Sequence, residues 1–392
     1  MAESGTRAAD DDGSRKRQCV ALRVAAVTPH EHVLAGTFWQ QHCGSNDTSV
    51  RLIAGAYRRS LECNSSKMVA DTATRAVTVQ TPSLFIDLRI AQARPAVLAQ
   101  AGSLEELTNA QIASLASSTH CFGGATEREP PSDDVPHGHT CVCTRSHLID
   151  WQSFPRLSPN RWSVEERWEH GGWVEWSVRR DAAGQAAYIE HWRTLHGSRE
   201  PFLALRRITQ SSLPFPEALL LVAGDAFAFI EGRRQGLPLV VPGTDGQPAD
   251  RGRIEPLVAA AIAADDRDAL LAMCSMECHY GSVSGAPGEG HEEDPEASLL
   301  RGGRTATAGR WRIDLSSGPW REGTSFAEYV QGFRIGGIDP PAPQDVKENA
   351  LPGLPTMRLA HTSSHDKRSH DLWQVFQCEG ISSVGELMRI LS

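Results

Sequence analysis

Charged and aromatic side chains alternate along one short segment of the chain, in a spacing that could serve acid–base or binding chemistry. In residues 84–90 the odd positions carry Phe85, Asp87 and Arg89, while the even positions are aliphatic. Alternate residues of a β-strand point to the same face of the sheet. We therefore expect these three side chains to point together, either into solvent or into the polar lining of a cavity.

Glu190 has a similar setting, because Tyr188 and Trp192 stand two positions away on either side. If this face lines an interior, the buried carboxylate needs a cationic partner, for which Arg89 or Arg321 is suited. Such a pair orients a polar ligand or, with a raised carboxyl pKa, acts as a general acid or base. The candidate catalytic residues are Glu190, Asp87 and Arg89. A structural ion pair or a solvated face explains the same residues and is the interpretation that we favour.

Tryptophan is concentrated in one part of the chain. The sequence has ten Trp against four Tyr, and one cluster comprises Trp162, Trp168, Trp173, Trp176 and Trp192. An inward-facing Trp can form the wall of a ligand cavity while its N–H finds a partner, or it can simply fill the core of a large sheet. The candidate ligand-binding residues are Phe85, Trp176, Tyr188, Trp192, Trp311, Trp320, Arg321 and Glu322.

Two groups of cysteine and histidine could hold a metal ion. The first comprises Cys121, His137, His139, Cys141, Cys143 and His147, and the second comprises Cys274, Cys278 and His279. Structural zinc sites usually use paired Cys-x-x-Cys motifs, whereas Cys141-x-Cys143 has no matching second motif. Ordinary buried cysteines are favoured, so we predict no metal site. No residue can be assigned as an axial haem ligand either, and the cofactor stays unknown.

Several common catalytic motifs are absent from the sequence. It contains no Gly-rich dinucleotide-binding motif after a strand, no P-loop, no Gly-x-Ser-x-Gly, no His-Glu-x-x-His and no Cys-x-x-Cys. Nucleotide-dependent chemistry on the common folds is therefore not expected.

Charge and hydropathy point away from nucleic acid and membrane. The formal net charge is -9, from 39 Lys and Arg against 48 Asp and Glu, and a sequence-independent nucleic-acid binder needs a basic surface. No apolar stretch approaches the ~20 residues that span a bilayer. The amino-terminal residues lack the features of a secretory signal, and the nine cysteines are an odd number. We expect a cytoplasmic protein with reduced thiols.

Strand-like segments recur through most of the chain and are joined by turn signals. The clearest hairpin surrounds Gly224-Asp225, between two apolar runs. A helix is expected after the capping-box patterns at Ser103 and Thr108, and another over residues 254–276, interrupted at Asp265-Asp266. We predict a mainly β protein, with an antiparallel, closed or nearly closed barrel of about a dozen strands, two or three helices and disordered insertions.

The predicted organisation has three parts. Residues 1–18 are polar and form a disordered tail. Residues 19–335 form the β-barrel domain or domains, with a disordered insert near residues 285–303 that is rich in Gly, Glu and Pro. Residues 336–392 form a Pro-rich linker and a strand-containing extension.

Three of these motifs carry a resemblance. Residues 80–90, the pattern Tyr188-x-Glu190-x-Trp192 and the hairpin around Gly224-Asp225 resemble lipocalin-like (calycin-type) barrel proteins, including the fungal Hri-type family. Two further motifs, Gly309-x-Trp311-x-Ile313 and Pro319-Trp320-Arg321-Glu322-Gly323, resemble a carboxy-terminal signature of bacterial proteins with a similar layout. The resemblance covers about residues 70–335. It implies a calycin-like barrel, a fold that usually binds small and often apolar ligands, and it implies no catalytic assignment.

Three functions follow as hypotheses. The first is binding of a small hydrophobic or amphipathic molecule in a Trp-lined barrel cavity. The second is a nucleotide-independent lyase or isomerase that uses the carboxylate and arginine groups of the same cavity. The third is a protein-interaction module whose disordered segments bind a partner.

Overall fold

The computed structural model describes only part of the chain. The described residues are 53–64, 69–71, 73–131, 135, 138–152, 159–167, 172–195, 197–198, 200–208, 218–233, 254–283, 311–326, 336–339, 356–362 and 368–379. The predicted tail at 1–18, the predicted insert at 285–303 and Trp168 lie outside these residues. The division into a tail, a barrel region and an extension stays a prediction.

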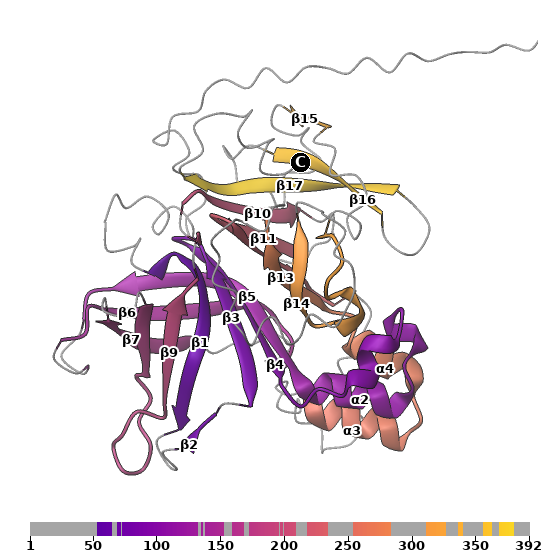
Figure 1. The fold of residues 1–392 in the computed structure, drawn as a ribbon, viewed down its shortest axis with the longest axis horizontal. Coiled ribbons are helices and arrows are strands. Elements are labelled where there is room, and N and C mark those ends of the chain that lie inside the picture. Colours follow the sequence, from indigo (N-terminus) through magenta and orange to yellow (C-terminus); the bar gives the residue numbers. More distant parts are fainter. Residues whose placement is uncertain are drawn as a thin grey trace, which may run out of the picture.

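Strands between residues 55 and 194 form a closed antiparallel barrel of eight strands (Figure 1). The order is β1-β3-β4-β5-β6-β7-β8-β9, and β9 pairs back with β1. The strands are β1 (Gly55–Asn64), β3 (Thr74–Gln80), β4 (Leu84–Ala91), β5 (Thr119–Glu129), β6 (Cys141–Asp150), β7 (Asn160–Arg167), β8 (Gly172–Ser177) and β9 (Tyr188–Thr194). The short β2 (Val69–Ala70) pairs with the end of β1.

The other described strands form a second antiparallel sheet, also of eight strands, in the order β14-β13-β12-β11-β10-β17-β16-β15. They are β10 (Phe202–Ile208), β11 (Ala218–Ala223), β12 (Ala226–Glu231), β13 (Glu277–Ser282), β14 (Arg312–Ser316), β15 (Gly336–Asp339), β16 (Thr356–Thr362) and β17 (Arg368–Glu379). The predicted closed barrel is thus confirmed, but a barrel of about a dozen strands is wrong. Strand-like patterns in a sequence do not reveal which sheet each strand joins.

The turn predicted at Gly224-Asp225 is present in the second sheet. Gly224 and Asp225 form the two-residue turn between β11 and β12, where Ala223 pairs with Ala226. Gly224 has a φ of 56°, a left-handed conformation that glycine adopts without steric cost. The predicted hairpin is confirmed.

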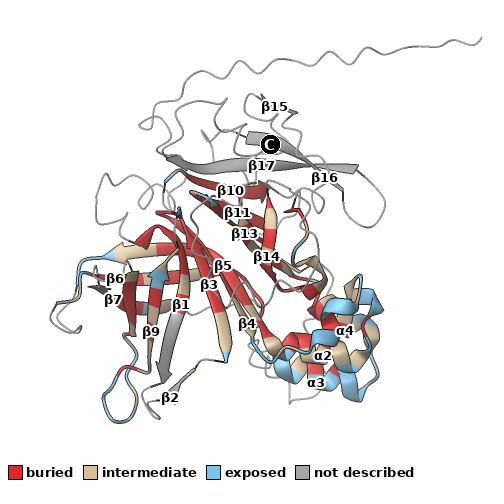
Figure 2. Ribbon diagram, viewed as in Figure 1, coloured by how far each residue is buried: buried red, intermediate tan, exposed pale blue. Residues whose placement is uncertain are grey.

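The outer face of β4 packs against the second sheet. Leu84, Ile86 and Leu88 are each 1% exposed and share one apolar cluster with Leu219 and Leu221 of β11. Figure 2 shows buried residues along these facing strands. The alternation along β4 therefore divides the strand between two environments: its aliphatic face lies between barrel and sheet, and its polar face points into the barrel.

Three α-helices lie together beside one end of the barrel (Figure 1): α2 (Asn109–Ser118), α3 (Ile254–Ala263) and α4 (Arg267–Met273). The capping box at the start of α2 is formed, because the Thr108 hydroxyl accepts from the Gln111 N–H at 3.3 Å and Gln111 Oε1 accepts from the Thr108 N–H at 2.8 Å. The expected interruption at Asp265-Asp266 separates α3 from α4, and the Asp266 side chain caps α4. Within the described ranges, none of these helices has the length and apolar character needed to cross a membrane.

Candidate functional site

An ion-pair network crosses the inside of the barrel between β4 and β9. Arg89 donates through Nε to Asp87 Oδ1 at 2.8 Å and through Nη1 to Glu190 Oε1 at 2.6 Å. Its Nη2 donates to the second oxygen of each carboxylate, at 3.2 Å for Asp87 and 3.1 Å for Glu190. Asp87 is 0% and Glu190 2% exposed. The structure therefore brings all three candidate catalytic residues together, in the ion pair that the strand spacing indicated.

Arg59 of β1 extends this network toward the rim of the barrel. Its Nη1 donates to Glu190 Oε1 at 3.1 Å, and its Nη2 donates to Asp71 Oδ2 at 3.0 Å. The contact exists because β9 closes the barrel by pairing with β1. Glu190 is therefore held between two guanidinium groups, and the second of them is Arg59 rather than Arg321.

Asp87 also faces Arg145 of β6, whose Nη1 lies 3.8 Å from Asp87 Oδ2. Burial alone would raise the pKa of Asp87, but the charge and hydrogen bonds of Arg89, followed by the charge of Arg145, bring this pKa below its ordinary value. Burial acts to lower the pKa of Arg89, and its two carboxylate partners outweigh that effect and raise this pKa well above its ordinary value. Both groups are therefore ionised at neutral pH.

Glu175 of β8 places a second acid opposite Glu190 in the strand register. Tyr188 donates its hydroxyl to Glu175 Oε1 at 2.8 Å and accepts from Asn160 Nδ2 at 3.0 Å. Burial and then the charge of Glu190 raise the pKa of Glu175 to about 7. Its Oε2 has no hydrogen-bond partner among the described residues. Glu175 is therefore a buried acid that exchanges its proton near neutral pH.

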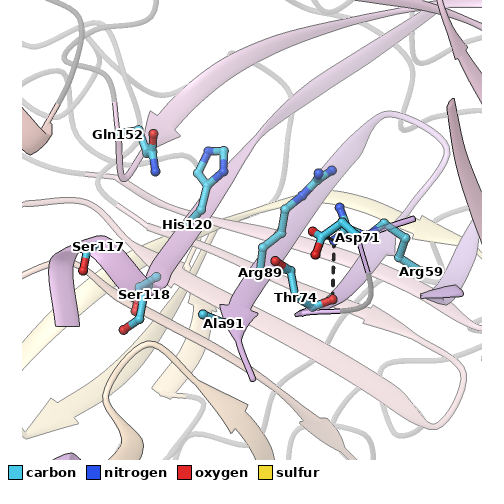
Figure 3. A pocket seen from close by; sticks show the side chains of 10 residues that line it. Arg59, Asp71, Thr74, Arg89, Ala91, Ser117, Ser118, His120 and Gln152 are labelled. Carbon is cyan, nitrogen blue, oxygen red and sulfur yellow. Dashed lines mark hydrogen bonds and ion pairs between the residues drawn. The ribbon is translucent and has the colours of Figure 1, made fainter. Parts of the chain in front are cut away.

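A pocket of about 230 Å³ opens at the rim of the barrel beside this network (Figure 3). It is lined by Arg59, Asp71, Thr74, Arg89, Ala91, Ser117, Ser118, Thr119, His120 and Gln152. These residues come from β1, β3, β4 and the start of β5, from the residue after β2, from the last residues of α2 and from the segment after β6. The pocket and the network share Arg59 and Arg89, so a molecule in the pocket would contact the charged interior.

Apart from Arg59, Arg89 and Asp71, which is paired with Arg59, the lining of this pocket is uncharged. Burial, and then the charge of Arg89, lower the pKa of His120 to about 4, which leaves its imidazole neutral at pH 7. Thr119 precedes His120 on β5 and faces the other side of the strand, and its hydroxyl is buried. A neutral imidazole both donates and accepts a hydrogen bond. His120 can therefore donate to a polar group in the pocket or accept from it.

A β-bulge interrupts the pairing of β5 with β6, close to His120. The register between β5 and β6 shifts between Gly123 and Gly124, which leaves Leu148 unpaired. Residues three apart on a strand normally face opposite sides, but this extra residue turns His147 and Asp150 to the same side, where Nδ1 and Oδ2 lie 2.6 Å apart. Gly124 permits the bulge, because a Cβ there would lie 2.0 Å from a backbone oxygen of β6.

Three of the clustered tryptophans lie inside the barrel. Trp162, Trp173 and Trp192 are at most 3% exposed and belong to one cluster with Tyr57. The indole N–H of each Trp has no hydrogen-bond partner among the described residues. Trp192 also lies under Arg89, whose guanidinium carbon is 5.8 Å from its ring centroid. These rings form an aromatic wall with unused donors around the charged network.

The structure separates the candidate ligand-binding residues into three places. Phe85, Tyr188 and Trp192 line the inside of the barrel. Trp176 is on the outer face of β8, where its indole donates to Glu165 Oε2 at 3.0 Å. The remaining candidates are Trp311, directly before β14, Trp320 and Arg321 in the 3₁₀ turn η5 (Pro319–Arg321), and Glu322, directly after it. Trp311 packs in a separate cluster of the second sheet, and Glu322 pairs with Arg94 at 2.5 Å. Trp176, Trp311, Trp320, Arg321 and Glu322 thus do not join the barrel interior.

Four residues that sequence reasoning did not select belong to the site. Glu175 alternates with Trp173, and Arg145 alternates with Cys143, so the same period of two that indicated Glu190 could have found both. His120 lies at the start of β5, directly after α2, where no alternation precedes it. Arg59 had no local signal, because its contact depends on the closure of β1 onto β9.

The cysteine and histidine groups do not assemble a metal site within the described ranges. No three side chains among His, Cys, Asp and Glu converge there. Cys141 and Cys143 lie together, Cys274 and Cys278 are buried as free thiols, and His137 lies outside the described residues.

Comparison with known proteins gives little further guidance. No protein-family model and no curated protein sequence matches this chain. Among solved structures, the chain is similar to the crystal structure of the uncharacterised protein YLR301w from Saccharomyces cerevisiae, with 12% sequence identity and a TM-score of 0.39. That similarity covers 83% of this chain and 99% of the yeast chain.

Proposed function

We propose that the barrel binds a small, uncharged amphipathic molecule at its polar rim. The single observation that carries this proposal is the pocket of about 230 Å³ whose lining includes Arg89 and the neutral imidazole of His120. At ~30 Å³ for each water, this volume corresponds to roughly eight waters, which suits a compact ligand and excludes a long acyl chain.

The charge balance of the site supports an uncharged polar group. Arg89 is occupied by Asp87 and Glu190, and Arg59 by Glu190 and Asp71. A charged ligand would have to compete with these carboxylates or guanidinium groups and lose its own hydration. A hydroxyl or amide of a ligand can instead form a hydrogen bond with His120 without disturbing an ion pair.

A calycin-like identity belongs to the same proposal. Successive strands of the barrel are neighbours and the last pairs with the first, which is the up-and-down order of the eight-stranded lipocalins. Such barrels hold one small ligand at an open end, as we propose here.

The alternative of a lyase or isomerase is less well supported by the network geometry. Both oxygens of Asp87 and both oxygens of Glu190 accept hydrogen bonds from Arg89. Because these hydrogen bonds stabilise the ionised form of both carboxylates, Asp87 and Glu190 are better suited to fixing the position of Arg89 than to transferring a proton. The alternative of an interaction module depends on the segments predicted to be disordered and on residues 336–392, of which the structure describes β15, β16 and β17.

Ligand-observed NMR with three probes of equal chain length tests the binding proposal: 1-hexanol, hexanoate and hexylammonium. We expect 1-hexanol to give the strongest saturation-transfer signal. Ala91→Trp, which places an indole in the pocket, should remove the signal, and the exposed neighbour variant Gln92→Trp should retain it. Absence of binding by all three probes, or an unchanged signal in Ala91→Trp, would refute the proposal.

A further inference from the structure

A pair of cysteines lies near the opposite end of β6 from the rim pocket, in contact with an arginine. Cys141 and Cys143 share one face of the strand, and their Sγ atoms are 3.9 Å apart. Arg128 of β5 donates from Nη2 to the Cys141 sulfur at 3.2 Å. Cys141 is 4% and Cys143 0% exposed, so both sulfurs are buried, and Cys141 lies at the start of the strand, next to the exposed Thr140. A peroxide small enough to enter beside Thr140 would therefore meet Cys141 first.

The two sulfurs differ in their electrostatic setting. The hydrogen bond from Cys143, together with the charge and hydrogen bond of Arg128, outweighs burial and lowers the pKa of Cys141 to about 6. Burial raises the pKa of Cys143 well above the ordinary value, so this residue keeps its proton and donates it to the neighbouring sulfur. Arg145 is a second cation near Cys143, besides Arg128. A thiolate beside a thiol is the arrangement in which one cysteine attacks and the other resolves.

Among the described residues, the hydrogen bond to Cys141 is the one that the buried guanidinium of Arg128 makes. Its Nε and Nη1 are buried and have no hydrogen-bond partner among the described residues. A cation held in this way favours an anionic sulfur at its side. The register supports the placement, because Arg128 is directly opposite Cys143 in the ladder between β5 and β6.

We propose that Cys141 and Cys143 form a two-cysteine redox site that reduces a small hydroperoxide. The Cys141 thiolate attacks one oxygen of the peroxide, so that an S–O bond forms, the O–O bond breaks and the departing hydroxide takes a proton to become water. Cys143 sulfur then attacks Cys141 sulfur, the S–S bond forms, the S–O bond breaks, and the second hydroxide leaves as water with the Cys143 proton. Two thiols and one hydrogen peroxide thus give one disulfide and two waters.

The strand geometry permits the second step. Alternate residues of an antiparallel strand are separated by ~6.8 Å between Cα atoms, at the upper end of the range that a disulfide bridges. Both side chains already lie on one face, so approach of the sulfurs requires side-chain rotation and a small adjustment of the strand end. Cys274 and Cys278 offer internal controls, because burial raises both of their pKa values and keeps them as thiols.

Peroxide titration of the full chain at pH 7, with trapping of free thiols and peptide mass spectrometry, tests this proposal. In the wild type we expect the peptide with Cys141 and Cys143 to lose two hydrogens before Cys274 or Cys278 reacts. In Cys143→Ser the reaction should stop at a sulfenic acid on Cys141, detected as a dimedone adduct. A thiol of pKa about 6 is ~90% thiolate at pH 7 against ~3% at an ordinary pKa of 8.5.

Removal of the cation should slow the reaction. Arg128→Met should oxidise at least about fivefold more slowly than the wild type, while Arg161→Met, which alters an exposed arginine paired with Glu129, should react at the wild-type rate. Circular dichroism checks that each variant is folded, and the Cys143→Ser result decides the matter if Arg128→Met is not. The proposal would be overturned if Cys121, Cys141, Cys143, Cys274 and Cys278 were all oxidised at one rate. It would also be overturned if the Cys143→Ser variant formed the dimedone adduct at Cys274 as readily as at Cys141.

Discussion

At the scale of single residues, Glu190 is the carboxylate that joins Arg59 and Arg89 inside the barrel. Replacing it with Gln leaves Arg59 and Arg89 buried without their shared anion. Removal of one partner from a buried pair costs about 3–5 kcal/mol, so we expect Glu190→Gln to lower the unfolding free energy by about that amount in urea denaturation.

A matched variant separates this effect from the loss of any charge. Glu129→Gln removes an acid whose partner Arg161 is on the surface, with side chains 53% and 43% exposed. Exposed pairs contribute at most about 1 kcal/mol, so this variant should be nearly neutral. Equal losses in the two variants would contradict a structural role for the network.

Glu175 should make stability depend on pH in a defined direction. Its pKa is raised from 4.5 to about 7 in the folded state, first by burial and then by Glu190, so the folded protein binds this proton more tightly than the unfolded chain does. The resulting stability is complete below pH 4.5 and is lost as the pH rises through 7. For a fully buried group the loss is about 3 kcal/mol.

The difference in unfolding free energy between wild type and Glu175→Gln isolates this contribution, because other titrating groups cancel. Measured from pH 5 to 8.5, the wild type should lose stability relative to the variant as the pH rises. A difference that stays constant over this interval would show that Glu175 does not hold its proton as described.

At the scale of elements, β4 shows what a strand pattern can and cannot reveal. Its period of two correctly separated an aliphatic face from a face with Asp87 and Arg89. The sequence left open whether the polar face met solvent or a cavity, because that depends on the strands opposite. Closure of β9 onto β1 decides it, and no local pattern in either strand encodes that pairing. The same reason explains why Arg59 was not foreseen.

The other face of β4 should contribute stability through packing. Leu88 is 1% exposed between the barrel and the second sheet, and shortening a buried Leu to Ala costs about 2–5 kcal/mol. We expect Leu88→Ala to lower the urea midpoint accordingly. Val97→Ala is the control, because Val97 is 45% exposed and its loss should change stability by less than about 0.5 kcal/mol. A neutral Leu88→Ala would indicate that barrel and sheet are not tightly packed.

At the scale of the whole molecule, the error in strand count has a physical cause. Eight strands close on themselves and eight others form a sheet against the barrel, and the strand-like patterns of the sequence do not distinguish the two groups. A barrel hides its edges by closure, whereas an open sheet must protect them. The second sheet continues past β10 because β17, far along the chain, pairs with it over Phe202–Ile208. Pairing of such distant segments cannot be derived from local periodicity, so the sequence alone predicted the class of fold and missed the division into two sheets.

This pairing makes a prediction about the carboxy-terminal segment. A chain that ends at residue 355 lacks β16 and β17, which leaves the hydrogen-bonding edge of β10 uncovered. Because an exposed edge pairs readily with other chains, we expect the shortened protein to unfold at a lower temperature and to form oligomers in light scattering. A chain that begins at residue 19 is the control, and it should behave as the full chain does. If the shortened protein stays monomeric with an unchanged unfolding midpoint, β17 is not an integral strand of the sheet. Pull-down experiments with and without residues 336–392 would then report on the binding of partners alone. If it aggregates, a loss of partners on deletion reflects damage to the sheet, and point variants in the segment are needed instead.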